Sequence, residues 1–189
     1  QAIAGDFNGD GHQDVLVGSS TTGAVKLYTG DGSGMVTFAQ DISLPGGVVR
    51  ELAAFDLDHD GRTDFVAIQS AFDGSNQSIV VCYGLASGFS APVVLTPSGL
   101  VFAQGIAAGD FDHDGRTDLA IGTFGSDATN NATIDVFLAT DTGFELGGTL
   151  TVPGGHLGSD FAVGDFNGDG FDDLATTALG AVAVFLSTP

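Results

Sequence analysis

Four short segments of this 189-residue chain carry aspartate or asparagine at alternate positions, a pattern that suits the binding of a cation. Each segment reads Asp-x-(Asp/Asn)-x-Asp-Gly-x-x-Asp, and we number its positions 1 to 9. Hard oxygen ligands favour calcium, whereas magnesium favours smaller octahedral sites that keep several waters. The sequence therefore predicts about four Ca²⁺ ions, one in each of loop 1 (6–14), loop 2 (56–64), loop 3 (110–118) and loop 4 (165–173).

The spacing assigns a role to most positions of these loops. Side-chain oxygens alternate at positions 1, 3 and 5, a carboxylate returns at position 9, and the glycine at position 6 permits a sharp turn. The first half resembles an EF-hand loop, but position 12 is never the glutamate of an EF-hand and the flanks resemble strands. Position 7 offers only its backbone carbonyl, which would come from His12, Arg62, Arg116 and Phe171.

Converging carboxylates also need a counter-charge. Two carboxylates about 4 Å apart repel by roughly 4 kcal/mol at an effective dielectric constant of 20. Without a cation, three or four such groups would force the loop open or raise their own pKa values. The plainer interpretation is a set of solvated turns rich in Asp and Gly, but it does not explain four copies in register.

The loops begin 50 to 55 residues apart, and similar apolar segments recur around each of them. A small-residue segment precedes the loop, an apolar run and then a β-branched and aromatic run follow it, and the first three units add a weaker fourth segment. These runs are bounded by turn residues and none keeps a 3.6-residue period, which indicates strands and no helices. The expected first strands are 2–5, 52–55, 106–109 and 161–164; the second 15–17, 65–68, 119–121 and 174–175; the third 25–28, 79–83, 134–138 and 182–186; the fourth 35–42, 89–95 and 144–152.

Four strands in about 50 residues make one blade of a β-propeller. We therefore expect an all-β chain, a β-propeller with four blades of which the last lacks its outer strand. The apolar second and third strands suit sheets that are packed on both faces. A β-sandwich with decorated loops is the alternative, and it does not account for the repeat. The repeats would span approximately 1–47, 48–100, 101–155 and 156–189.

The acidic loops resolve an unusual composition. The chain has 24 acidic and 4 basic residues and a formal net charge of −20, yet 43% of its residues are hydrophobic, so it can bury a core. Four basic residues cannot form the face that nucleic acid or an anionic membrane requires. No run of about 18 apolar residues occurs, so we expect no membrane insertion. Because the predicted side-chain ligands include 14 of the 24 acids, most of the charge belongs to the predicted metal sites.

These loops and their period resemble the FG-GAP/VCBS repeat family, whose best-known members are the integrin α-subunit propellers. The resemblance covers essentially the whole chain and implies that each loop joins the first two strands of a blade and binds calcium. The implied side-chain ligands are Asp6, Asn8, Asp10 and Asp14; Asp56, Asp58, Asp60 and Asp64; Asp110, Asp112, Asp114 and Asp118; and Asp165, Asn167, Asp169 and Asp173.

Propellers of that family usually have seven blades, whereas four units are visible here. Three interpretations follow from this difference. The chain is a fragment of a larger propeller, a compact four-bladed ring with an incomplete last blade, or a unit whose open blade edge pairs with another chain.

Few other residues suggest chemistry. No Ser/His/Asp or Cys/His set can be assembled, the carboxylates are committed to metal, and His156 is expected in an exposed loop, so we expect no enzyme. The single cysteine, Cys82, lies in an apolar run and is interpreted as a buried hydrophobe. Asn76 and Asn131 begin N-glycosylation sequons between the second and third strands of their units. Aromatic side chains that could stack on a sugar, but are expected to serve packing, are Tyr28, Tyr83, Phe72, Phe124 and Phe171.

Three functions are compatible with these features. The first is a calcium-stabilised extracellular propeller, secreted or at the cell surface, that serves adhesion by binding a protein or glycan ligand. The second is a non-catalytic module of a secreted carbohydrate-active enzyme. The third is a structural subunit that self-associates through its open blade edge. Extracellular calcium would fill even weak sites, but the fold alone does not choose among these functions.

Overall fold

The computed structural model describes residues 1–71, 73, 75–95, 103–123, 131–152, 157–178 and 180–188. Within these ranges every regular element is a β-strand, all pairings are antiparallel, and no sheet closes on itself. None of these residues belongs to a helix of the length and hydropathy needed to cross a membrane. The chain divides into two compact units, Gln1–Thr96 and Pro97–Pro189, each built on two sheets.

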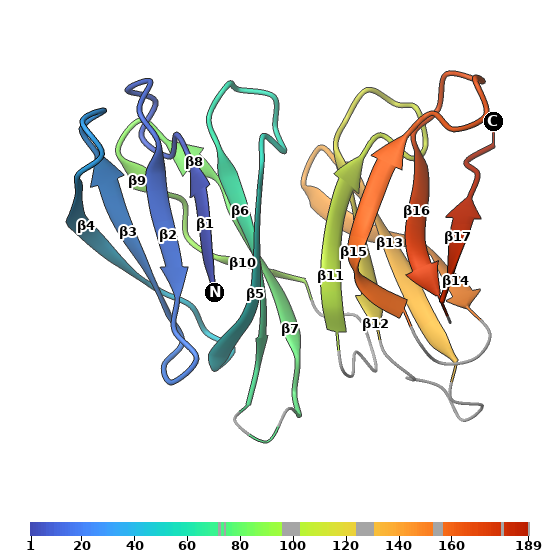
Figure 1. Cartoon of the computed structure of the whole chain (residues 1–189), viewed down its shortest axis with the longest axis horizontal. Coiled ribbons are helices and arrows are strands. Elements are labelled where there is room, and N and C mark those ends of the chain that lie inside the picture. Colours follow the sequence, from blue (N-terminus) through green and yellow to red (C-terminus); the bar gives the residue numbers. More distant parts are fainter. Residues whose placement is uncertain are drawn as a thin grey trace. The chain divides into compact units, whose positions relative to one another are not determined.

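The first unit holds two four-stranded sheets (Figure 1). In one, the strands follow chain order: β1 (Ala2–Gly5), β2 (Asp14–Gly18), β3 (Ala24–Gly30) and β4 (Val36–Ser43). In the other, β10 pairs with β7, β7 with β6 and β6 with β5, and a small β8–β9 hairpin is inserted before β10. Their bounds are β5 (Val48–Phe55), β6 (Asp64–Ser70), β7 (Ser78–Cys82), β8 (Gly84–Leu85), β9 (Gly88–Phe89) and β10 (Val93–Leu95).

The second unit repeats this plan. Its first sheet has the order β11-β12-β13-β14, and its second has the order β15-β16-β17, with three described strands. The bounds are β11 (Ala103–Gly109), β12 (Asp118–Thr123), β13 (Ala132–Thr140), β14 (Gly143–Val152), β15 (Leu157–Gly164), β16 (Asp173–Ala178) and β17 (Ala181–Phe185). The exposed Val182 and Val184 lie on the outermost strand of the three-stranded sheet.

The expected strands are found in the expected order within each sheet, including the three described strands of the last repeat, and the short β8 is an addition that the sequence did not indicate. One segment differs, because 89–95 was expected as a single strand. It forms β9 and β10 instead, separated at Pro92, whose lack of an amide proton suits a break in a strand. The arrangement of the four sheets around one axis, as in a propeller, stays a prediction.

Each unit has a hydrophobic core shared by its two sheets. In the first unit Phe7, Leu16 and Leu27 pack in one cluster with Leu52 and Phe65 of the neighbouring sheet. The β8–β9 hairpin adds to this core, because the Phe89 ring lies 5.9 Å from that of Phe7 and 4.9 Å from that of Phe65. In the second unit the corresponding cluster joins β11, β12, β13 and β14 with β15 and β16.

The second strand is less buried in the first repeat than in the second and third repeats. All seven residues of β6 and all six of β12 are buried. The residues of β2 instead alternate between buried and half-buried. Only the side of β2 that carries Leu16 is therefore packed in the core, and the expectation of two covered faces does not hold for this sheet.

The burial of Cys82 gives a direct test of the first core. Its side chain is fully buried, and burial raises the pKa of the thiol to about 12. Because the thiolate is the reactive form, we expect iodoacetamide to leave Cys82 unmodified in the folded chain and to modify it fully in denaturant, as measured by mass spectrometry. Rapid modification of the folded chain would show that β7 is not in the core.

Candidate metal centres

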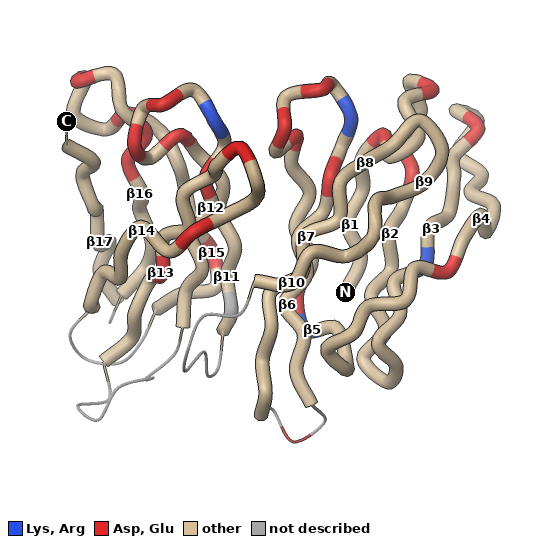
Figure 2. The backbone as a smooth tube through the Cα atoms, turned by 180° about the vertical axis from the view of Figure 1, so that it is seen from behind, with Lys and Arg blue, Asp and Glu red and all other residues tan. Residues whose placement is uncertain are grey.

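All four acidic loops occupy the same place in their sheets. Each joins the first strand to the second, between β1 and β2, β5 and β6, β11 and β12, and β15 and β16. In each unit the acidic residues of the loops therefore gather at one end of the sheets (Figure 2). The sequence placed the loops there correctly, since short apolar runs on both sides marked the two strands.

The aspartate at position 9 is buried and anchors the whole loop. Asp118 accepts a hydrogen bond from the amide of Phe111 (2.9 Å) through Oδ2 and from the amide of Ala139 on β13 (2.8 Å) through Oδ1. Each of the other loops repeats this pair, so the carboxylate ties the start of the loop to the end of the third strand. The equivalent donors are Phe7 and Gly30 for Asp14, Leu57 and Gly84 for Asp64, and Phe166 and Ser187 for Asp173.

The aspartate at position 1 closes the turn from the other side. The carboxylate of Asp110 accepts hydrogen bonds from the amides of Asp114 (3.0 Å) and Gly115 (3.0 Å). Asp6, Asp56 and Asp165 accept the corresponding amides in their loops. The chain therefore wraps around this carboxylate, as a cation-binding loop requires.

The turn needs left-handed backbone at two positions. The glycines at position 6 have φ between 82° and 91°, and an added Cβ there would meet no atom within 4 Å, so backbone conformation and not space requires glycine. Position 4 has positive φ as well, which the sequence did not indicate. Glycine fills it in loops 1 and 4, whereas His59 (57°) and His113 (61°) adopt the same conformation in loops 2 and 3.

Positions 3, 5 and 7 are linked in a way that the sequence interpretation missed. The Asn8 amide donates to Oδ2 of Asp10 at 2.9 Å, and Asn167 donates in the same way to Asp169 at 2.9 Å. Loops 2 and 3 carry aspartate at position 3 and have no such donor there.

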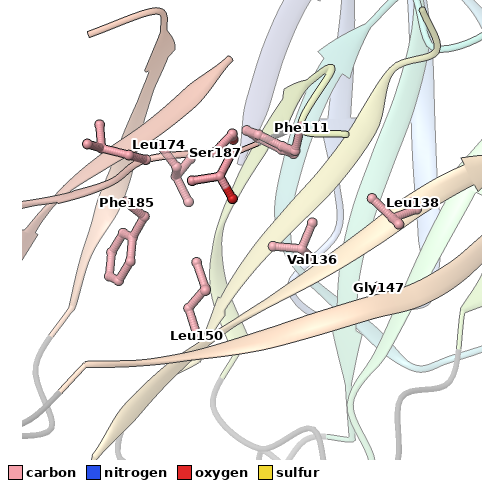
Figure 3. Close-up of a pocket in the computed structure, with 10 residues that line it drawn as sticks. Phe111, Val136, Leu138, Gly147, Leu150, Leu174, Phe185 and Ser187 are labelled. Atoms are coloured by element: carbon pink, nitrogen blue, oxygen red, sulfur yellow. The ribbon is translucent and has the colours of Figure 1, made fainter. Parts of the chain in front are cut away.

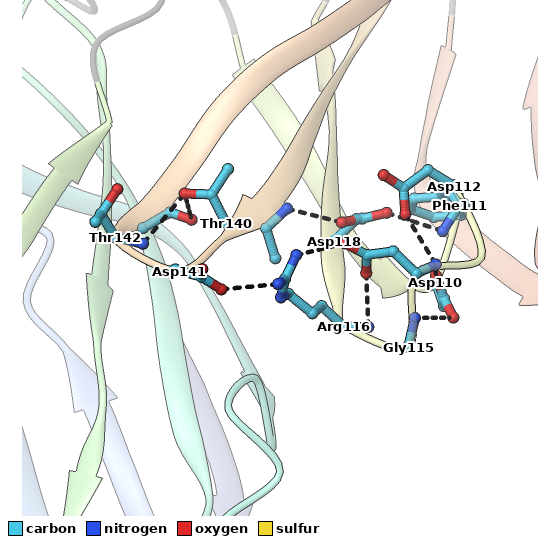
Figure 4. A network of polar contacts seen from close by, with 12 residues as sticks. Asp110, Phe111, Asp112, Gly115, Arg116, Asp118, Thr140, Asp141 and Thr142 are labelled. Carbon is cyan, nitrogen blue, oxygen red and sulfur yellow. Dashed lines mark hydrogen bonds and ion pairs between the residues drawn. The ribbon is translucent and has the colours of Figure 1, made fainter.

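In those loops an arginine at position 7 supplies the missing donor. Arg116 pairs with Asp114 at 2.6 Å and with Asp141 at 2.7 Å (Figure 4). In loop 2, Arg62 pairs with Asp60. The sequence did carry a signal for this exchange, because arginine occurs at position 7 only in the two loops that have aspartate at position 3.

Three carboxylates converge in each of loops 2 and 3. Oxygen atoms of Asp56, Asp58 and Asp64 lie within 4.8 Å of one another, and the same holds for Asp110, Asp112 and Asp118. Position 5 is outside both clusters, since its carboxylate is paired with arginine. In loops 1 and 4, where asparagine replaces one acid, the described residues form no cluster of three acids.

The electrostatics of the two clusters favour an added positive charge. Burial raises the pKa of Asp118 to about 6, and the charges of Asp112 and Asp114 add to the rise. Burial likewise raises the pKa of Asp64, with further contributions from Asp58 and Asp56. These carboxylates need a proton or a cation nearby, and the all-oxygen donor set fits calcium.

The remaining sequence candidates are not among the clustered carboxylates. Asn76 is exposed in the loop between β6 and β7, and Asn131 is half-buried directly before β13. The Tyr28 ring packs against that of Phe38 at 5.8 Å, and burial raises the pKa of the half-buried Tyr83. Phe72, Phe124 and His156 lie outside the described residues.

A cavity of about 410 Å³ lies between the two sheets of the second unit (Figure 3). Ten described residues line it, and none of them is ionisable. Phe111, Val136, Leu150 and Phe185 supply much of its apolar wall, while Ser187 and Thr188 provide the hydroxyls. The cavity therefore offers an apolar surface and no group able to transfer a proton near neutral pH.

Two curated proteins are similar to this chain in sequence. Integrin alpha-PS5 of Drosophila melanogaster is 32% identical over 155 residues, and integrin alpha-PS3 of the same organism is 30% identical over 152 residues. The matches cover 71% and 70% of this chain but only 15% and 13% of the integrins, so the chain spans a small part of their length.

Among solved structures, a rhamnogalacturonan lyase of Bacillus licheniformis aligns with a TM-score of 0.58 at 14% identity, over 92% of this chain and 39% of the lyase. Rhamnogalacturonan lyase YesW aligns with a TM-score of 0.58 at 13% identity, over 95% of this chain and 40% of that one. At such low identity the likeness concerns the fold alone.

Family models match most of the chain. Residues 6–67 and 56–121 each match the FG-GAP-like repeat, and residues 157–185 match the FG-GAP repeat. These matches contain all four acidic loops, and they agree with the resemblance drawn from the loops themselves. With four repeated loops, antiparallel sheets and integrin alpha relatives, the chain belongs to the FG-GAP repeat family.

Proposed function

We propose that this chain is part of a calcium-stabilised β-propeller that recognises a protein ligand outside the cell, either secreted or at the cell surface. The observation that carries the proposal is the convergence of three carboxylates in each of loops 2 and 3, at the same end of their sheets. The integrin alpha relatives support an adhesive role and a protein ligand.

Calcium would be held by the side chains at positions 1, 3, 5 and 9 and by the backbone carbonyl at position 7. The ion would supply the positive charge that the clustered carboxylates lack. The loops are already wrapped by hydrogen bonds to positions 1 and 9, so binding need not create the turn. Calcium would instead hold the ends of the first two strands together, which is how the metal would stabilise the sheets.

We further propose that the chain acts by binding and not by catalysis. The carboxylates that could serve as acid and base are hydrogen-bonded to backbone amides within the loops. The apolar cavity of the second unit has no ionisable lining residue. Incubation with rhamnogalacturonan, the substrate in the names of the structural neighbours, should release no product, and product release would contradict this proposal.

Calcium should raise the thermal stability of the chain. When the free calcium concentration is a hundred times the Kd of a site, binding stabilises the folded state by about 2.7 kcal/mol. In a protein of this size, each 1 kcal/mol of added stability raises Tm by about 2–4 °C. We therefore expect Tm in 2 mM calcium to exceed Tm in a chelator by about 10 °C or more, measured by scanning calorimetry. Equal values would remove calcium from the proposal.

Two aspartates of loop 3 should separate the structural role from the metal-binding role. Asp118→Ala leaves two backbone amides without their acceptor, so it should lower the free energy of unfolding by about 2–5 kcal/mol even in a chelator. Asp112→Ala removes an exposed group and should change the free energy of unfolding in a chelator by less than about 1 kcal/mol.

The Asp112→Ala variant should also respond differently from the wild-type chain when calcium is added. Asp112→Ala should lose part of the calcium-dependent rise in Tm, because it removes a ligand from a loop that stays folded. The measurement is urea unfolding with and without calcium. Similar losses for the two variants in a chelator would contradict the anchoring role of position 9.

The ligand class can be tested by probing arrays of extracellular proteins and of glycans with the labelled chain. We expect binding to a protein that is lost in a chelator. Binding to glycans alone would instead favour a module of a carbohydrate-active enzyme, and binding that a chelator does not affect would separate recognition from calcium.

A further inference from the structure

Loops 3 and 4 contact each other through a backbone amide and through side chains that are not among the predicted ligands. Oδ2 of Asp172, at position 8 of loop 4, accepts a hydrogen bond from the backbone amide of Asp110 at 3.0 Å. The ring of Phe171, at position 7 of loop 4, lies 4.4 Å from the ring of His113 in loop 3, with an interplanar angle of 44°. Two independent contacts therefore join the two loops.

Asp172 lies between two residues that would hold the cation of loop 4. Phe171 would offer its carbonyl, and Asp173 its carboxylate. The backbone here is fixed from the third strand as well, because the Ser187 hydroxyl donates to the Asp172 carbonyl at 2.6 Å and the Ser187 amide donates to Asp173 at 2.8 Å. A cation that orders residues 171–173 would thus also order the Asp172 side chain.

The hydrogen-bond donor in this contact is Asp110, the first residue of loop 3. The Asp110 carboxylate gathers the amides of Asp114 and Gly115, and its own backbone amide is held by Asp172. Asp172 thereby fixes the residue around which loop 3 wraps. It also places a negative charge beside the carboxylates of loop 3, which favours a cation there.

We propose that Asp172, together with the Phe171–His113 contact, couples the calcium sites of loops 3 and 4, so that filling one raises the affinity of the other. The inference rests on the proposed calcium binding and adds a regulation to it. The physical basis is shared ordering: a cation in loop 4 immobilises residues 171–173, so loop 3 loses less conformational entropy when it binds its own cation. Coupling of this kind commonly changes affinity by about 5-fold or more.

The first unit provides an internal comparison, since loops 1 and 2 are related in the same way. Thr63 of loop 2 occupies position 8, and an added Cβ on Gly5 would lie 3.2 Å from its methyl group, just as one on Gly109 would lie 3.0 Å from Oδ2 of Asp172. Within the described hydrogen bonds Thr63 accepts none from the amide of Asp6, the counterpart of Asp110. The partners of the ring contact are replaced by Gly9 and by Arg62, whose guanidinium pairs with Asp60 in its own loop.

The test is a calcium titration of the whole chain followed by NMR. The amides of Gly115 and Gly170 report loops 3 and 4, because each donates to the position 1 carboxylate of its own loop. Asp169→Ala weakens loop 4 without removing a contact to loop 3. We expect it to raise the calcium midpoint of Gly115 about 5-fold. By reciprocity, Asp112→Ala in loop 3 should raise the midpoint of Gly170 by the same factor.

The matched control lies in the first unit, where Asp58→Ala in loop 2, the counterpart of Asp112→Ala in loop 3, should leave the midpoint of the Gly11 amide in loop 1 unchanged. A double-mutant cycle then isolates the coupling. In the Asp172→Thr background, which gives loop 4 the residue of loop 2, Asp169→Ala should no longer shift Gly115. Asp172→Asn keeps a hydrogen-bond acceptor without the charge, so it should retain part of the shift.

The outcomes separate the two proposals. If none of the loop glycine amides moves with calcium, the proposed calcium binding is wrong. If calcium binds but Asp169→Ala leaves the Gly115 midpoint unchanged, the proposed coupling is wrong. It is also wrong if Asp169→Ala shifts the Gly115 midpoint by the same factor in the wild-type chain and in the Asp172→Thr background. Unchanged resonances of the β12 and β13 amides verify that each variant is folded.

Discussion

The loops and sheets depend on one repeated interaction, the buried carboxylate at position 9 with its two backbone amides. Through it Asp14, Asp64, Asp118 and Asp173 each join the start of a loop to the end of the third strand or to the residues directly after it. A charged group out of water is tolerated only when it is well hydrogen-bonded. The interaction therefore fixes the position of the loop before any cation arrives, and the metal acts on a preformed site.

Much of the fold could be predicted because its signals are local. Runs of β-branched residues bounded by glycine and aspartate marked nearly every strand, and the period of the loops grouped them into sheets. The first strand of the first repeat was predicted with its observed bounds, whereas those of the other three repeats were predicted too short, as in β5, which begins at Val48 and not near Leu52. The register shift between Val49 and Glu51 explains this, since a bulge lets a strand continue past the point where its side-chain alternation breaks.

The residues of the candidate metal sites were predicted from the sequence, but the hydrogen bonds that hold them were not. Position 9 was interpreted as a ligand only, because its partner amides on the third strand lie 14 to 21 residues away and no local pattern announces them. The contact between Asp172 and Asp110 spans 62 residues and was equally invisible. Such contacts arise from the packing of one sheet beside another, which a single repeat does not encode.

The exchange between position 3 and position 7 has a consequence for how the repeats could diverge. Counted over positions 1, 3, 5, 7 and 9, a loop with asparagine at position 3 has three aspartates, and a loop with aspartate there has four aspartates and an arginine, so each set of five carries a net charge of −3. A lineage that converts one form into the other by single substitutions passes through −4 or −2. The first intermediate attracts its cation more strongly and the second more weakly, so the order of the two substitutions decides whether the site survives the change.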